Sequence, residues 1–168
     1  MSVSVSAETK KLWRTIGIIA VVGILVLIPL VWLALRLRDD AYRRRVVVAN
    51  EVETLSVLEG IAAAQQLYLQ SNSQYGTFKQ LVEAGVFRAP LEGDTLVADG
   101  YSFKLKVTPK AEGQTSSFSV NADPLVSGGR DATGKRHFYL DSNLVGIRVN
   151  EERPASASDP PRQTVNDY

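Results

Sequence analysis

Hydrophobic residues form one uninterrupted run near the start of the chain, and this run predicts a membrane-spanning helix. Residues 15–35 include fourteen Ile, Val or Leu and no charged residue. At about 1.5 Å of rise per residue the run would span roughly 30 Å, the thickness of a bilayer's hydrocarbon core. A backbone in lipid must satisfy its own hydrogen bonds, so we expect a helix. A cleaved signal peptide is the alternative, but Arg36-Leu37-Arg38 follows the run where a small-residue cleavage site would stand.

A second hydrophobic pattern begins directly after this run and predicts an amphipathic helix over residues 41–71. Its apolar positions recur every three or four residues, which is the spacing of one helix face. We expect one continuous helix that ends within 71–76, where Gly76 suits a positive backbone φ. The predicted apolar stripe runs through Val48, Val52, Leu55, Leu58, Ile61, Ala62, Gln65, Tyr68 and Leu69, and the opposite face carries Glu51, Glu53, Glu59 and Gln66.

The pattern changes to strict alternation in the second half of the chain and predicts a small α+β domain. Residues 78–86 suit a short helix with Gly85 as its C-cap, and 90–100 suits an irregular loop. Four antiparallel strands are then expected, over 101–108, 118–122, 136–141 and 144–149, the last two joined by a tight turn at Ser142-Asn143. One face of such a sheet needs a cover. We therefore predict that the amphipathic helix packs on the sheet, with Val52, Leu55, Leu58 and Ala62 against Tyr101, Phe103, Leu105, Phe118, Val120 and Phe138.

These patterns together predict the organisation of the whole chain. We expect a disordered N-terminal tip over 1–11, a transmembrane helix over 12–38 and an amphipathic helix stalk over 39–72. The α+β head covers 73–150. A disordered tail follows over 151–168, because Pro, Ser and Asp dominate its composition.

Composition narrows the classes of function. The net charge of +1 gives no general field that would attract nucleic acid, so no nucleic-acid partner is expected. The chain has no cysteine, which excludes disulfides, thiol catalysis and Cys-ligated zinc. Its one histidine, His137, makes a histidine-based triad or metal centre improbable, and we expect it to be an exposed strand residue. We therefore predict no enzymatic activity and no cofactor.

Three carboxylates and one basic run are the remaining candidates for binding. Asp123, Asp131 and Asp141 lie around a glycine-rich stretch, but calcium needs six to eight closely placed oxygens and their spacing matches no defined calcium loop. We interpret them as turn-forming residues, with a calcium site as the alternative. The run Arg43-Arg44-Arg45 suits either anionic lipid headgroups or a solvated collar beside the membrane.

The order of short motifs along the chain resembles that of type IV pilins and pseudopilins. The resemblance covers roughly residues 28–150. Each motif is weak alone, and their collinear order carries the resemblance. The motifs are Ile28-Pro29, Ala49-Asn50-Glu51, Tyr68 with Tyr75-Gly76, Phe78 with Leu81 and Gly85, Gly100-Tyr101-Ser102-Phe103, Asn121-Ala122-Asp123-Pro124, and the final stretches 133–141 and 146–150.

The resemblance implies a pilin-like fold and a structural role beside a type IV pilus or type II secretion assembly, with the bilayer and other pilin-like subunits as partners. The family carries a Gly-Phe processing site before its apolar segment and a Glu within it. In this chain Gly17 is followed by Ile18, and 15–35 has no acidic residue, so we expect an unprocessed N-terminus. The alternative is a stand-alone, membrane-tethered binding module.

Membrane orientation is predicted differently by charge and by resemblance. Five Lys or Arg residues follow the span up to Arg45 and three precede it, which by the positive-inside rule favours a cytoplasmic head. The resemblance implies a head outside the cytoplasm, anchored in the inner membrane. We expect the outside placement, because a folded domain after a first span can override a difference of two charges.

Overall fold

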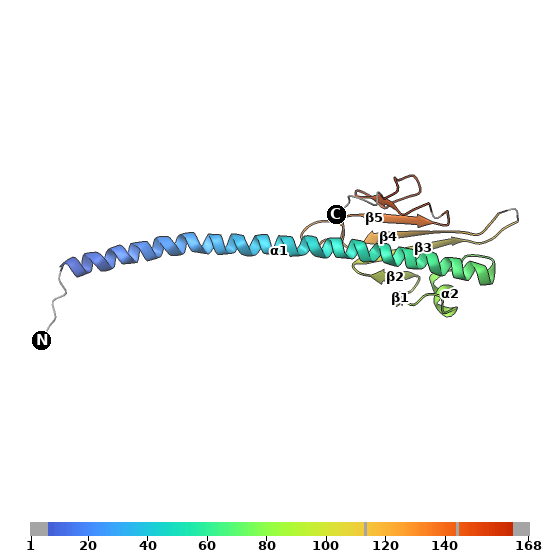
Figure 1. The fold of residues 1–168 in the computed structure, drawn as a ribbon, viewed down its shortest axis with the longest axis horizontal. Helices are drawn as coiled ribbons and strands as arrows, with labels where there is room; N and C mark the ends of the chain where they lie inside the picture. The colour runs from blue at the N-terminus through green and yellow to red at the C-terminus, as the bar shows by residue number, and fades with distance from the viewer. Residues whose placement is uncertain (1–6, 113, 144, 163–168) are drawn as a thin grey trace. The chain divides into compact units, whose positions relative to one another are not determined.

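A computed structural model of the chain describes residues 7–112, 114–143 and 145–162. The chain divides between Tyr42 and Arg43 into two compact units, and helix α1 (Ala7–Asn72) contributes to both (Figure 1). The prediction of one continuous helix is thus confirmed. The predicted disordered tip is wrong for residues 7–11, which are ordinary helix formers inside α1. Residues 1–6 of that tip lie outside the described part of the chain.

In the first unit, α1 is apolar and exposes its large side chains, among them Leu27 and Trp32. It is one helix, near the N-terminus, that is long and apolar enough to cross a membrane. A signal sequence passes the same test of length and composition. The Arg36 guanidinium lies 5.1 Å from the centre of the Trp32 ring, so this cation contacts an aromatic face at the end of the apolar run.

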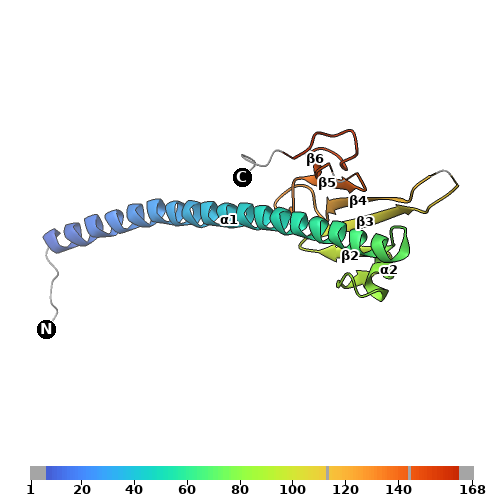
Figure 2. The ribbon, with the colours of Figure 1, turned by 45° about the vertical axis from the view of Figure 1, so that its right-hand side comes forward.

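The second unit contains a six-stranded antiparallel sheet in which every strand pairs with its neighbours in sequence (Figure 2). The α+β class is as predicted, whereas the prediction of four strands is wrong. The strands are β1 (Leu91–Glu92), β2 (Thr95–Ala98), β3 (Tyr101–Thr108), β4 (Ser117–Pro124), β5 (His137–Asp141) and β6 (Arg148–Asn150).

The two additional strands form a hairpin within the predicted loop 90–100. Leu96 pairs with Leu91 on one side and with Phe103 of β3 on the other, and Gly93 takes a φ of 64° at the turn. Strands of two and four residues are too short to show alternation, and the neighbouring Pro and Gly favour a loop prediction. A turn does lie at Ser142-Asn143. It does not join two strands directly, because β6 begins only at Arg148, so the predicted strand 144–149 is wrong.

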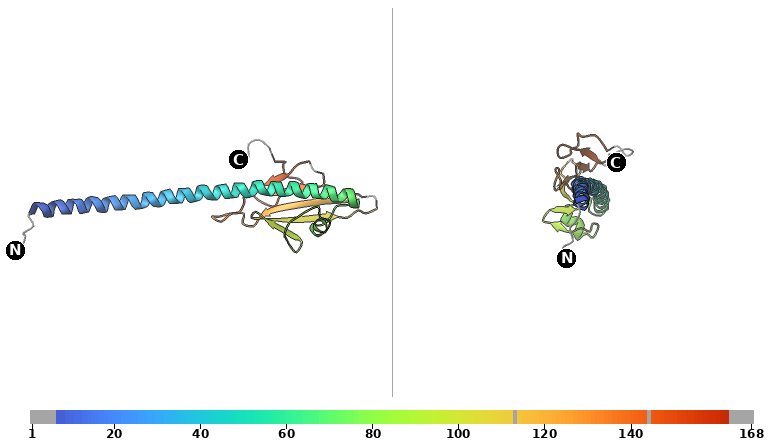
Figure 3. Two further views of the ribbon diagram at one scale, coloured as in Figure 1. Left: turned by 60° about the horizontal axis from the view of Figure 1, so that its bottom comes forward. Right: turned by 90° about the vertical axis from the view of Figure 1, so that its left-hand side faces the viewer.

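The core lies between one face of α1 and one face of the sheet (Figure 3). Leu55, Leu58 and Ile61 of α1 are buried against the sheet, as predicted for the first two. Val52 instead leaves 45% of its surface exposed, so its place in the predicted stripe is wrong. The sheet side of the core contains Leu96, Tyr101, Phe103, Phe118, Val120, Ala122, Phe138 and Leu140.

The short helix α2 (Phe78–Glu83) follows the end of α1 and begins with a capping box between Thr77 and Gln80. The helix is shorter than the predicted 78–86, and its C-cap is Ala84 instead of Gly85. Gly85 follows the cap with a φ of 71°, a backbone conformation that glycine adopts without strain. The positive φ predicted at Gly76 occurs at Ser73 instead. Gly76 is required for another reason: a Cβ there would lie 2.9 Å from the Tyr68 ring.

Candidate functional site

The first polar site of the head joins α1 to the segment before β5, and its centre is Glu51. This carboxylate was predicted to lie on the exposed face, but only 3% of the residue is exposed. Its Oε1 accepts the backbone N–H groups of Lys135 at 2.9 Å and Arg136 at 3.3 Å, and its Oε2 lies 3.7 Å from Arg136 Nε. A buried carboxylate is tolerated because these donors replace the water that it loses.

Two further side chains of α1 hold the loop that leads to this segment. Asn50 donates to the Thr133 carbonyl at 2.8 Å, and Arg43 donates to the Arg130 carbonyl at 3.0 Å and to Asp131 Oδ1 at 2.9 Å. Thr133 also closes the loop at its base, because its N–H donates to the Val126 carbonyl at 2.9 Å. Loop 126–133 is therefore fixed along two turns of α1.

Tyr101 connects the same segment to the core. Its hydroxyl donates to the Arg136 carbonyl at 2.9 Å. Burial, with the charge of Glu51 adding to it, raises the pKa of the Tyr101 phenol above its ordinary value, so the hydroxyl keeps its proton. A Cβ at position 134 would overlap this hydroxyl, so the approach of the two segments requires Gly134.

His137 forms a second polar site, on the sheet. The prediction of an exposed His137 is wrong: it is buried, and its Nδ1 lies 2.6 Å from Asp123 Oδ1 on the neighbouring strand. An imidazole oriented by a carboxylate is also part of catalytic triads. Ser102, however, is registered opposite Asp123, so the carboxylate stands between the hydroxyl and the imidazole. This order does not let His137 activate Ser102 as a nucleophile.

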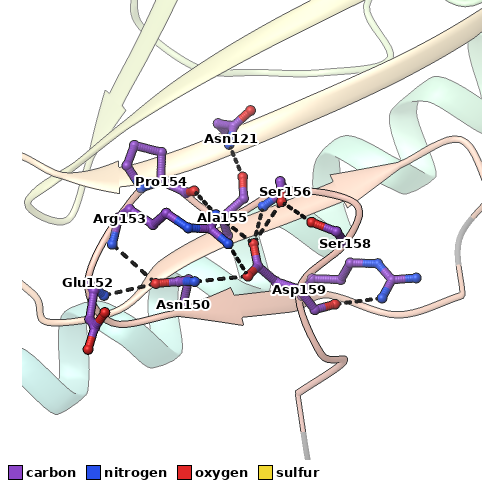
Figure 4. Close-up of polar contacts among 10 residues, drawn as sticks. Asn121, Asn150, Glu152, Arg153, Pro154, Ala155, Ser156, Ser158 and Asp159 are labelled. Carbon is purple, nitrogen blue, oxygen red and sulfur yellow. Dashed lines mark hydrogen bonds and ion pairs between the residues drawn. The ribbon is translucent and has the colours of Figure 1, made fainter.

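The third site is the segment after β6, which contradicts the predicted disordered tail over residues 151–162. Asp159 is buried, and its carboxylate accepts hydrogen bonds from Asn150, Arg153 and Ser156 at 2.8–3.0 Å (Figure 4). The donors from Asn150 and Ser156 hold the pKa of Asp159 well below its ordinary value. Residues 163–168 of the predicted tail lie outside the described part of the chain.

The same segment is fastened to the sheet at two points. Asn121 of β4 donates to the Ala155 carbonyl at 2.7 Å (Figure 4). Arg148 of β6 donates to the Asp159 carbonyl at 2.7 Å. We call residues 150–161 the C-terminal strap. The hydrogen bonds of the strap converge on its one buried carboxylate, Asp159. The composition of the segment did not indicate this arrangement.

The three calcium candidates lie in separate environments. Asp123 contacts His137, Asp131 contacts Arg43, and Asp141 accepts the Asn143 N–H at 3.0 Å in a turn. Within the described residues, no group of three or more His, Cys, Asp or Glu side chains is placed to hold a metal ion. The structure therefore does not bring Asp123, Asp131 and Asp141 together.

The face of α1 that points away from the sheet carries apolar as well as charged side chains. Small and apolar residues recur on it every three or four positions, and all of them are exposed. Beside Gly60 lies an apolar recess of about 250 Å³, lined in part by Val57, Phe87 and Leu96. The exposed row consists of Ala49, Val52, Ser56, Gly60, Ala63 and Leu67.

A second recess, of about 350 Å³, lies at the other end of the head, where α1 ends. Among the described residues, hydroxyl groups dominate its lining, with one amide and one ammonium group and no carboxylate. The lining residues are Leu69, Ser73, Tyr75, Lys110, Thr115, Ser116, Ser142 and Asn143.

No family model, curated protein or solved structure matches this chain. Its function must therefore be inferred from the surfaces described above.

Proposed function

We propose that the chain is a single-pass membrane protein of the pilin-like type. In this proposal the apolar part of α1 anchors it in the inner membrane, and the α+β head is displayed outside the cytoplasm. It serves as a structural component beside a type IV pilus or type II secretion assembly, where it contacts other pilin-like subunits. It carries out no chemical reaction.

The exposed row on α1 is the observation that carries the proposal. One face of the helix is buried on the sheet, while the opposite face exposes Val52, Gly60 and Leu67. Small residues let a second helix approach closely, and the apolar side chains between them gain from leaving water. The row thus suits a helix of a neighbouring subunit, and the apolar run before it would bring such subunits together in one bilayer.

The second candidate function is a membrane-tethered binding module. The hydroxyl-lined recess at the end of α1 favours it, because a concave site with a few polar groups suits a small polar ligand. In this case the exposed row on α1 would have no partner.

Cysteine cross-linking in native membranes separates the two functions, and the chain has no cysteine of its own to interfere. Ser56→Cys places a thiol on the exposed row, and Lys106→Cys places one on an exposed strand position of the sheet. We expect oxidation to link Ser56→Cys chains to each other, or to a pilin-like subunit with a cysteine on the matching helix face. Lys106→Cys chains should link only at background level.

A second substitution tests whether close helix packing causes the cross-link. Gly60→Leu adds a large side chain to an open position where a Cβ would meet nothing within 4 Å. It should therefore preserve the fold and abolish the cross-link at Ser56→Cys. Equal linking at Ser56→Cys and Lys106→Cys, unaffected by Gly60→Leu, would reject the pilin-like role and favour the binding module.

A further inference from the structure

The loop 126–133 extends along α1 toward the N-terminal end of the head. Asn50 contacts the base of the loop at Thr133, whereas Arg43 contacts Arg130 and Asp131 near its tip. Seven residues of helix separate Asn50 from Arg43, or about 10 Å of rise. The tip thus reaches the first residue of the second unit.

Chain connectivity keeps this tip close to the apolar run. Arg43 follows Leu35, the last residue of the run, by eight positions along α1. Eight residues of helix rise by about 12 Å, so Arg43 cannot lie much farther than this from the end of the run, however the two units are arranged. The headgroup layer occupies the first several ångströms beyond the hydrocarbon core. Arg43, which contacts the loop tip, is therefore tethered within about 12 Å of the end of the run.

Positive charge exceeds negative charge at the same level, since residues 36–45 of α1 contain five arginines and two aspartates, Asp39 and Asp40. Arg43, Arg44 and Arg45 follow one another on α1, and the loop adds Arg130, whose carbonyl is held by the Arg43 side chain. The loop contributes one carboxylate, Asp131, which pairs with Arg43 at 2.9 Å. Cations this close to a bilayer are attracted by anionic headgroups.

We propose that loop 126–133 and the Arg43–Arg45 run together bind the anionic headgroups of the bilayer that α1 crosses. Arg130 is the loop's contribution to this surface, and Arg43 positions the loop. The binding would hold the head at the membrane surface. The inference rests on the proposed membrane insertion of residues 15–35, so its test includes an independent measure of insertion.

The test uses the full chain reconstituted in vesicles of phosphatidylcholine and phosphatidylglycerol that contain a headgroup-attached quencher. A fluorophore is attached through Ser127→Cys, at an exposed position of the loop. A reference fluorophore is attached through Val145→Cys. Val145 is 75% exposed and lies two residues after Asn143, which lines the recess at the end of α1. A third, at Leu27→Cys, reports insertion of the apolar run through an acyl-chain quencher.

A difference in quenching between Ser127→Cys and Val145→Cys depends on distance as well as on charge, so the decisive result is the dependence on charge. We expect quenching at Ser127→Cys to fall at least twofold when Arg130→Gln is added, and again when phosphatidylglycerol is replaced by phosphatidylcholine. Arg88→Gln, which removes an exposed arginine beside the apolar recess, should change nothing.

Two outcomes separate the inference from the function on which it rests. Quenching at Leu27→Cys together with unchanged quenching at Ser127→Cys, in both Arg130→Gln and neutral vesicles, would overturn headgroup binding and leave the anchor intact. A Leu27→Cys fluorophore that is not quenched would overturn the membrane anchor, and headgroup binding with it.

Discussion

Glu51 of the long helix accepts the backbone N–H of Lys135 at 2.9 Å, across a sequence separation of 84 residues. The contact places a buried carboxylate between α1 and the segment that enters β5. The contact explains how Glu51 can be charged and yet lie on the buried face of the helix, because the N–H group supplies a hydrogen bond in place of water. The head therefore depends on a polar contact as well as on its apolar core.

Glu51→Ala should lower the free energy of unfolding of the head by about 2–4 kcal/mol, because two N–H groups and Arg136 would lose a buried partner. The measurement is denaturant unfolding of the full chain in detergent. Glu53→Ala is the matched control: it lies two residues away on the exposed face and should cost less than about 0.5 kcal/mol. Equal effects of the two substitutions would contradict the burial of Glu51.

Leu58→Ala should destabilise the head by about 2–5 kcal/mol, since Leu58 is fully buried between α1 and the sheet. Val52→Ala removes an apolar side chain from the same helix but from its exposed face, and it should cost less than about 0.5 kcal/mol. Thermal unfolding followed by circular dichroism measures both. A Val52→Ala variant as unstable as Leu58→Ala would mean that Val52 packs against the sheet, as the sequence pattern predicted.

The C-terminal strap should weaken in acid through Asp159. The folded state holds the pKa of this carboxyl below its ordinary value of 3.8, so the unfolded state binds the proton more readily. The stabilising effect is therefore fully present above pH 3.8 and is lost as the pH falls below that value toward the folded-state pKa. Unfolding free energies of the full chain, measured from neutral pH down through this range, test the sign.

Asp159→Asn supplies the comparison for the strap. It removes the titrating group, so the difference in stability between the unsubstituted chain and the variant should shrink as the pH falls through this range. Glu152→Gln changes an exposed carboxylate in the same strap and should change the unfolding free energy by less than about 0.5 kcal/mol. A constant difference between the unsubstituted chain and Asp159→Asn at every pH would show that Asp159 does not titrate in the way its contacts indicate.

The head should lie outside the cytoplasm. A reporter enzyme that is active only outside the cytoplasm, fused after Tyr168, should be active, and one that works only in the cytoplasm should be silent. The fusion point follows the strap, because a fusion at Asn150 would disrupt its contact with Asp159. Activity of the cytoplasmic reporter alone would reverse the orientation and exclude the pilin-like role.

The sequence by itself determined the elements whose signal is local. The apolar run, the continuation of α1 to Asn72, the alternation of β3 and the positive φ of Gly85 after α2 follow from neighbouring residues. Each is imposed by backbone hydrogen bonding and by the period of its apolar residues. These patterns are present in the chain before it folds.

The tertiary structure decided the environment of the polar residues. The helical pattern predicts an exposed Glu51, because a charged residue between apolar positions is taken to face solvent. In the structure, the N–H groups of Lys135 and Arg136, from a distant part of the chain, donate to the Glu51 carboxylate. His137 is buried as well, and its polar partner is Asp123 of the neighbouring strand β4. Asp159 lies in a segment whose composition indicates disorder, but the donors from Asn150 and Arg153 converge on it only once the strap has folded. Polar burial depends on partners that only the fold brings together, and a local pattern contains no information about them.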